Sequence, residues 1–277
     1  MNRQPAPTQA EHDRASVGLI YGLLAYGLWG ILPIYFKLLA AVSPVDIVAH
    51  RIVWSLFLLI LLLAVTRGWP QVRRAIKDRR TLVLLLTTSV LIAINWLLYV
   101  YAVNNGHILA GSLGYYLNPL MNILLGRFIL KEALTGLQWA AVAIAAAGVS
   151  VLAAGAGTTL WISLTLCISF ATYGLLRKVA AVDAVAGLSV ETVILLPVAL
   201  AWLAIGLGEG RAVFGSSQQE WWLLVLAGIV STTPLLLFTG AARRLRYSTL
   251  GMLQFLAPTL QFVVAVALYD EELTQAH

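Results

Sequence analysis

The run SLGYYLNPLMNILLGRFILKE, from Ser112 to Glu132, is matched later in the chain by TLGMLQFLAPTLQFVVAVALYDE, from Thr249 to Glu271. Both runs open with Ser or Thr followed by Leu-Gly. Both also hold a proline in an otherwise apolar middle, Pro119 in one and Pro258 in the other. In each run an acidic residue follows 13 positions after the proline. We interpret the two runs as copies of one helical segment.

A second echo lies near the start of each copy, where AYGL at 25–28 is matched by TYGL at 172–175. The repeating unit then holds five apolar stretches, and an odd number of crossings makes the second copy enter the membrane from the opposite side. Inverted repeats of this kind are typical of transporters that alternate access around a central site. We predict a first repeat at 16–155 and a second, inverted repeat of four spans at 158–277. Chance likeness between proline-containing apolar helices is the alternative.

The composition also indicates a membrane protein. The 277 residues are 60% hydrophobic and only 11% charged, which is too little charge for the surface of a soluble domain of this size. A membrane span needs about 20 apolar residues. We expect an all-α polytopic membrane protein in which the tenth helix of two five-helix repeats is missing, with nine spans at 16–39, 46–66, 81–103, 108–130, 136–154, 158–178, 188–207, 220–240 and 248–269.

Lys and Arg residues are concentrated in every second gap between these stretches. If the N-terminus is placed in the cytoplasm, 15 of the 18 basic residues lie on the cytoplasmic side, and only Lys37, Arg51 and Arg211 lie on the other. This asymmetry predicts a cytoplasmic N-terminus. We interpret the polar stretch 67–80 as a solvated loop that faces anionic lipid. Because the basic residues are spread over short gaps, nucleic acid is not an expected partner.

The sequence contains no pattern typical of an enzyme or a metal site. Its one cysteine, Cys167, cannot form an internal disulfide or a metal site alone. None of its four histidines belongs to an HxxxH pattern, and there is no nucleophile elbow or P-loop. A membrane enzyme acting on a lipid-linked substrate would need clustered Asp, His or Glu near one surface. We therefore predict no catalytic activity, no cofactor and no metal.

One face of the first span carries polar and aromatic residues. Gly22, Tyr26, Trp29 and Lys37 recur at helical spacing and share that face. A stripe of Tyr, Trp and Lys suits a water-accessible path, whereas the alternative is helix packing with Lys37 reaching outward to the interface. The GxxxG spacing of Gly18 and Gly22 favours close helix packing on the same span.

The prolines of the two repeated runs each have one polar residue four positions before and one three positions after, Tyr115 and Asn122 in one run and Gln254 and Gln261 in the other. Each proline removes a backbone N–H and frees an upstream carbonyl. Such sites are tolerated where the backbone lines a cavity or where neighbouring groups hydrogen-bond to the freed carbonyl. We predict that these faces line a central pathway, with helix–helix hydrogen bonding as the alternative. With an Asn-Trp-Tyr face from the third span, the pathway candidates are Tyr26, Trp29, Lys37, Arg51, Asn95, Trp96, Tyr99, Tyr115, Pro119, Asn122, Tyr173, Gln254, Pro258 and Gln261.

Two charged residues open spans on opposite sides. Arg51 opens the second span on the outer side, where it pairs with Asp46 one turn earlier or meets an anionic substrate. Glu191 opens the seventh span on the cytoplasmic side, where it pairs with Arg177 or Lys178. Charges that only anchor helix ends are the alternative for both. With these boundaries no acidic residue lies in the middle of a span, which disfavours a mid-membrane carboxylate relay for protons.

Five stretches resemble the RarD-type subgroup of the EamA transporters, within the drug/metabolite transporter superfamily: AYGLWGILPIYFKLL at 25–39, the HR-x2-WS pattern at 50–55, NWLLYVYAVNNGH at 95–107, SLGYYLNPLMNILLG at 112–126 and STLGMLQFLAPT at 248–259. The resemblance implies a bacterial inner-membrane protein with two inverted five-helix repeats. It also implies export or exchange of small metabolites or drugs, with a link to chloramphenicol sensitivity. The family pattern has a tenth helix after Glu272, and this chain ends at His277.

Three functions compete at this stage. The first is a permease or exporter of small metabolites or drugs, working by alternating access through an aromatic and polar pathway, with or without a coupling ion. The second is an inactive truncated product or a membrane scaffold, because the tenth helix is missing. The third is a lipid-linked membrane enzyme, which the lack of a catalytic cluster opposes. We expect the first, with a small-molecule substrate and membrane lipid as its partners.

Overall fold

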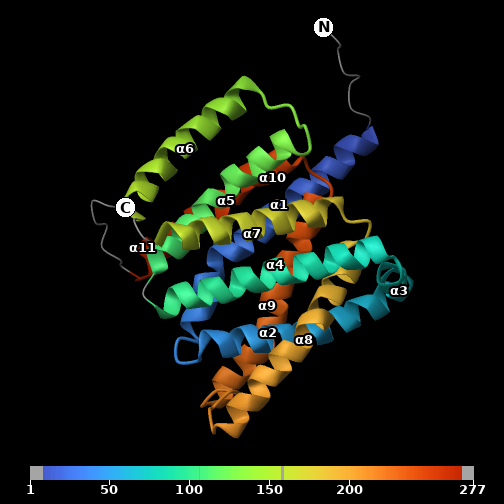
Figure 1. The fold of residues 1–277 in the computed structure, drawn as a ribbon, viewed down its shortest axis with the longest axis vertical. Helices are drawn as coiled ribbons and strands as arrows, with labels where there is room; N and C mark the ends of the chain where they lie inside the picture. The colour runs from blue at the N-terminus through green and yellow to red at the C-terminus, as the bar shows by residue number, and fades with distance from the viewer. Residues whose placement is uncertain (1–8, 106, 157–158, 270–277) are drawn as a thin grey trace.

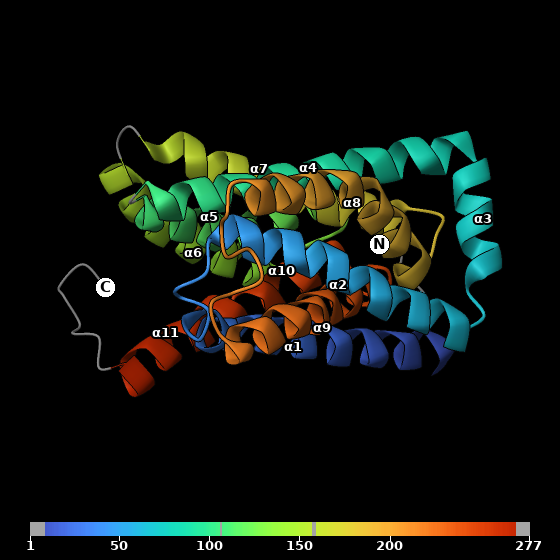
Figure 2. The ribbon, with the colours of Figure 1, turned by 90° about the horizontal axis from the view of Figure 1, so that it is seen from below.

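The computed structural model describes residues 9–105, 107–156 and 159–269, and in these ranges the chain is helical with no β-strand (Figure 1). The helices are α1 (Gln9–Lys37), α2 (Pro44–Val65), α3 (Trp69–Lys77), α4 (Arg79–Asn104), α5 (Ile108–Phe128), α6 (Gly136–Ala156), α7 (Leu160–Val179), α8 (Ala184–Gly208), α9 (Gln218–Ala242), α10 (Tyr247–Gln254) and α11 (Leu256–Tyr269). The helices cross one another at several angles (Figure 1), and α1 begins at the side of the molecule where α3 lies, opposite to the side where α11 stops (Figure 2).

Six of the described helices are both long and apolar enough to cross a membrane: α1, α2, α4, α7, α8 and α9. This supports the expected polytopic membrane protein. The other three predicted spans correspond to α5, α6 and the pair α10–α11. Nine crossings and two inverted repeats therefore remain predictions.

The ninth predicted span is not one continuous helix. It is divided at Phe255 into α10 and α11. Pro258 has no N–H, so the carbonyl of Gln254, four residues earlier, loses its helical partner, and α10 ends at that residue. The freed upstream carbonyl that the sequence predicts thus coincides with a break in the helix.

The prediction of a plain solvated loop at 67–80 was wrong, because this stretch contains α3. Pro70 lies in the first turn, a position that favours helix initiation. Val72 and Ala75 pack against a cluster that includes Leu85 of α4 and Val190 of α8. The basic residues of the stretch are exposed and do not lie on this apolar face, so the short helix packs across the ends of α4 and α8.

The centre of the bundle is aromatic. Tyr26 of α1, Tyr173 of α7, Phe238 of α9 and Tyr247 of α10 are each fully buried. The close packing predicted for Gly18 and Gly22 is present, since a Cβ at Gly18 would lie 2.9 Å from the Cβ of Arg244. These contacts seat α1 against α9 and α10 in the interior of the bundle.

The loop after α5 supplies a cap for α10. Glu132 accepts hydrogen bonds from the Tyr247 N–H at 2.6 Å, the Ser248 N–H at 2.9 Å and the Ser248 hydroxyl at 2.6 Å. Burial raises the pKa of this carboxyl, but the hydrogen bonds from Ser248 and Tyr247 and the charge of Lys178 outweigh it, so the net pKa lies below its usual 4.5. The ionised carboxylate is therefore the form that the fold favours.

We expect Glu132→Gln to lower the free energy of unfolding by about 1 kcal/mol at pH 7, because a neutral amide is a weaker acceptor at a helix N-terminus. A lowered pKa in the fold means that this stabilisation is present above pH 4.5 and is lost as the pH falls below it. Unfolding in mixed micelles from pH 7 to pH 3.5 should show the two proteins converging at low pH. Glu209→Gln, at an exposed carboxylate beside Arg211, is the control. A gap that does not narrow between pH 7 and pH 3.5 would contradict this assignment.

Candidate functional site

A small cavity lies between five helices of the bundle. Its wall includes Arg51 and Ser55 of α2, Ile92 and Trp96 of α4, Tyr173 of α7, Glu191 and Thr192 of α8, and Thr232 of α9. The volume is about 20 Å³, which is room for about one water molecule. The cavity thus joins helices from both halves of the chain around two charged residues.

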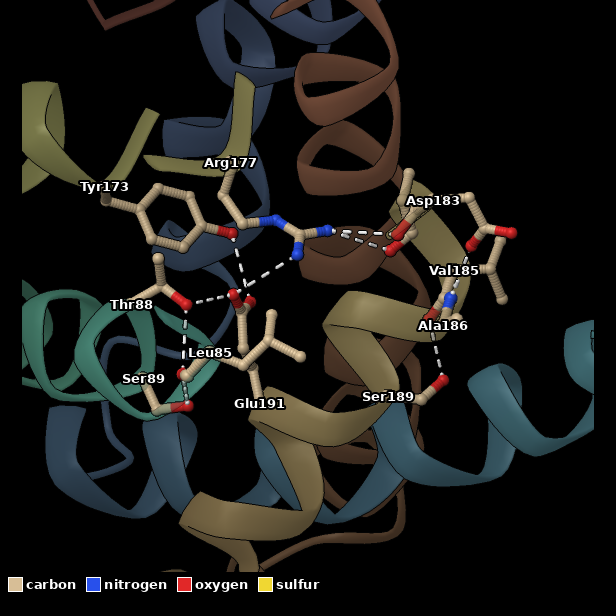
Figure 3. Close-up of polar contacts among 11 residues, drawn as sticks. Leu85, Thr88, Ser89, Tyr173, Arg177, Asp183, Val185, Ala186, Ser189 and Glu191 are labelled. Atoms are coloured by element: carbon tan, nitrogen blue, oxygen red, sulfur yellow. Dashed lines mark hydrogen bonds and ion pairs between the residues drawn. The ribbon is translucent and has the colours of Figure 1, made fainter. Parts of the chain in front are cut away.

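Glu191 is the acidic group of the cavity, and it is 1% exposed (Figure 3). One carboxylate oxygen accepts a hydrogen bond from the Thr88 hydroxyl at 2.5 Å and lies 3.6 Å from a guanidinium nitrogen of Arg177. The other oxygen accepts from the Tyr173 hydroxyl at 3.3 Å. The predicted pairing of Glu191 with Arg177 is therefore confirmed. Lys178 instead donates to the carbonyls of Ala242 and Leu245.

Arg177 is itself fully buried. Its guanidinium also donates to the carbonyls of Asp183 and Ala184, at 3.4 and 3.2 Å, where α8 begins (Figure 3). Gly187 leaves the space that this group occupies, because a Cβ there would lie 2.6 Å from one guanidinium nitrogen. The ion pair is thus held by both α7 and the first turns of α8, and its two charges cancel inside the protein.

The prediction that Glu191 opens a span was wrong. Asp183 caps α8 by accepting a hydrogen bond from the Ala186 N–H at 2.7 Å, so the helix begins at Ala184. Glu191 then lies two turns inside the helix. Glu191 is therefore buried within an apolar helix, about two turns from its start and not at its middle.

Arg51 is the second charged residue of the cavity wall. Unlike Glu191, which is paired with Arg177, it has no partner of opposite charge in the part of the chain that the structure describes. Its guanidinium carbon lies 3.8 Å from the centre of the Trp96 ring. Asp46 instead contacts Arg211 at 3.1 Å and the Trp202 N–H at 2.8 Å, so the proposed Arg51–Asp46 pair is wrong. Positions 46 and 51 are five residues apart, and their side chains leave an α-helix in different directions. Among the described residues, Arg51 forms no hydrogen bond or ion pair.

Three of the predicted pathway amides hold helices together in this conformation. Asn122 of α5 donates to the side chain of Gln254 of α10 at 2.6 Å. Asn95 of α4 donates to the Leu166 carbonyl at 2.9 Å and to the Ser169 hydroxyl at 3.0 Å on α7. This geometry corresponds to helix–helix hydrogen bonding, the alternative that the sequence left open for these positions.

The remaining candidates are spread over the bundle. Trp29 stacks in the aromatic centre, with ring centroids 5.7 Å from Tyr26 and 5.6 Å from Phe238. Tyr99 and Tyr115 contact each other at 5.6 Å. Apart from the three amides, the candidates outside the cavity wall are of three kinds. Tyr26, Trp29, Tyr99 and Tyr115 are in ring contacts, and Pro119 and Pro258 are buried within helices. Lys37 and Gln261 are exposed, and Gln261 donates to the Trp29 carbonyl.

Sequence reasoning missed several polar residues of the site. Thr88 completes the contacts of Glu191, while the Thr232 hydroxyl donates to Ser55 at 2.5 Å across α9 and α2. Hydroxyl residues inside apolar helices are a weak signal, since most of them bond to their own helix. An N-cap aspartate before α8 was the available clue to the depth of Glu191.

Comparison with known proteins assigns this chain to a family. The profile of the EamA-like transporter family matches residues 16–154. The chain belongs to this family. Protein RarD of Salmonella typhi is 47% identical over 92% of this chain and 87% of that protein. An uncharacterized transporter of Vibrio cholerae is 46% identical over 95% of this chain and 88% of that protein. The chloramphenicol-sensitive protein RarD of Pseudomonas aeruginosa is 34% identical over 92% and 86%.

The likeness extends to three dimensions. A solved crystal structure superposes with a TM-score of 0.72 over 94% of this chain and 91% of that one, at 19% identity, which shows a shared fold alone. The RarD-type EamA resemblance read from the sequence is confirmed by the relatives. The chain is therefore a RarD-type EamA transporter of a bacterial inner membrane with several spans.

Proposed function

We propose that this EamA protein moves a small metabolite or drug across the inner membrane by alternating access around the cavity between α2, α4, α7, α8 and α9. The observation that carries the proposal is a small cavity with a charged, aromatic wall. At about 20 Å³ it is too small for a metabolite, so loading requires helices of the wall to move apart.

The packing of the helices supports the two inverted repeats at 16–155 and 158–277. In the predicted repeats the counterparts are α1 and α7, α2 and α8, α4 and α9, and α5 and the pair α10–α11. When each helix is exchanged for its counterpart, the contact of α2 with α9 becomes that of α8 with α4. The contact of α1 with α9 becomes that of α7 with α4, and the contact of α5 with α7 becomes that of α11 with α1. Such a twofold relation would allow the same site to open to either side. The basic residues argue for a cytoplasmic N-terminus.

Transport by the purified protein tests this proposal. Proteoliposomes should exchange at least one labelled solute from a panel of metabolites and drugs that includes chloramphenicol. We expect Trp96→Ala to lower the exchange rate about tenfold or more, because it removes a large ring from the cavity wall. Trp139→Ala, on α6 and 42% exposed, is the matched control and should keep the rate.

Two results would contradict the proposal. One is the absence of exchange for every solute by a protein whose folded state is verified in the same liposomes, which would favour the inactive or scaffold alternative. The other is equal exchange by the Trp96 and Trp139 variants, which would remove the cavity from the pathway while leaving transport intact.

A further inference from the structure

The cavity holds one positive charge that the protein does not balance. Glu191 is paired with Arg177, and Arg211 is paired with Asp46. Arg51 lies on the same cavity wall as Glu191, yet within the described ranges no acidic side chain contacts it. An unbalanced cation among apolar helices costs free energy unless a partner of opposite charge arrives. Its natural partner is an anion that enters the cavity.

The stacking geometry leaves Arg51 able to bind such an anion. A guanidinium that lies over an aromatic ring uses its flat face, whereas its N–H donors lie in the plane of the group. Trp96 is the ring beneath it, at 3.8 Å. Because the described protein atoms accept none of these N–H groups, a fork of donors is free for a planar carboxylate.

We infer that the substrate of this transporter is a monoanionic carboxylate with an apolar body, and that Arg51 binds its carboxylate. This rests on the proposed transport function. The cavity carries one unpaired positive charge, so a monoanion neutralises it, whereas a doubly charged phosphate would bring one uncompensated charge into the membrane. The rest of the wall includes Ile52, Ile92, Leu188, Leu195 and Leu235, which suit an apolar body once the helices move apart.

Ligand-induced stabilisation of the purified protein in detergent tests this inference. The probes are benzoate, 3-phenylpropionate, hexanoate and indole-3-acetate, each beside its neutral primary amide, together with phenylphosphonate and sodium chloride. The dissociation constant follows from the rise in unfolding temperature with ligand concentration. We expect at least one carboxylate to bind about tenfold or more tightly than its own amide, since a charge-assisted hydrogen bond is about twice as strong as a neutral one.

Variants of arginine assign the effect to the cavity. Arg51→Gln should remove the preference for the carboxylate over its amide, and Arg51→Lys should keep part of it, because lysine retains the charge without the planar fork. Arg73→Gln, at an exposed arginine of α3, removes the same charge outside the cavity and should keep the full preference. If Arg51→Gln does not fold, Arg51→Lys still tests the inference, because its ratio of carboxylate to amide affinity should be lower than that of the unchanged protein.

The outcomes separate this inference from the proposed function. If no carboxylate binds better than its amide, or if the full preference survives in Arg51→Gln or Arg51→Lys, the inference is wrong even when other solutes are transported. If chloride or phenylphosphonate stabilises as strongly as any carboxylate, the site takes anions of another class and the inference also fails. If carboxylates bind through Arg51 but no solute crosses the membrane, the anion site stands and the transport proposal falls.

Discussion

Glu191→Ala is expected to lower the free energy of unfolding by about 3–5 kcal/mol, the usual cost of removing one partner from a buried ion pair. Arg177 is fully buried and its charge is balanced by Glu191 at 3.6 Å. Alanine would leave that guanidinium with only the two carbonyl acceptors at the start of α8. The Thr88 and Tyr173 hydroxyls would lose their acceptor as well.

A double-mutant cycle shows whether the loss comes from the unbalanced charge. Unfolding would be followed in mixed micelles for Glu191→Leu, Arg177→Met and the two together. Because replacing both members of a buried pair by apolar residues is often near neutral, the double variant should recover most of the stability lost in the single variants. Glu209→Ala, at an exposed carboxylate, should change stability by less than about 1 kcal/mol. Additive losses in the cycle would show that the two residues act independently.

Gly228→Ala is expected to cost about 1–3 kcal/mol, because the added methyl group has no space between α9 and α2. A Cβ at Gly228 would lie 2.6 Å from the Trp54 Cβ and 2.7 Å from the Ser55 backbone nitrogen, and it would overlap the Trp54 carbonyl carbon. A backbone cannot rotate away as a side chain can, so α2 and α9 would have to separate. The Thr232–Ser55 hydrogen bond at the cavity wall lies in the same interface and would lengthen.

A glycine in open space provides the control. A Cβ at Gly148, an exposed position of α6, meets no atom within 4 Å. Gly148→Ala should therefore keep or slightly raise stability, since alanine is favoured over glycine within a helix by up to about 1 kcal/mol. Thermal unfolding of both variants in the same detergent gives the comparison. Equal behaviour would show that the α2–α9 interface can adjust without loss.

The helices of this protein were largely predictable from its sequence because hydropathy and helix-breaking residues act locally. The apolar stretches and the close packing at Gly18 and Gly22 correspond to features of the structure, whereas the predicted span at 248–269 is divided at Phe255. The stretch 67–80 was misjudged because α3 gains its helical form by packing Val72 and Ala75 against distant helices. A nine-residue segment has too little helical stability of its own for its sequence to predict a helix.

The candidate site was predicted less well than the helices. Arg51, Trp96 and Tyr173 were found, because a charged residue is rare inside a span, Trp96 adjoins the Asn95–Tyr99 face and Tyr173 belongs to the repeated TYGL pattern. Asn95, Asn122 and Gln254 were grouped with them, although in this conformation they bond helix to helix. A helix face can be read from spacing, but whether that face meets a cavity or another helix depends on how the helices are arranged.

The sequence by itself determined that this is a helical membrane protein of the EamA family, because hydrophobic length and local motifs are properties of neighbouring residues. Only the tertiary structure decided how the charges are distributed. Glu191 meets Arg177 and Thr88, Asp46 meets Arg211, and Arg51 is left with Trp96. Asp46 and Arg211 are 165 positions apart in the chain, and Thr88 and Glu191 are 103 apart. Such pairings depend on distances between atoms after folding, which no local pattern encodes.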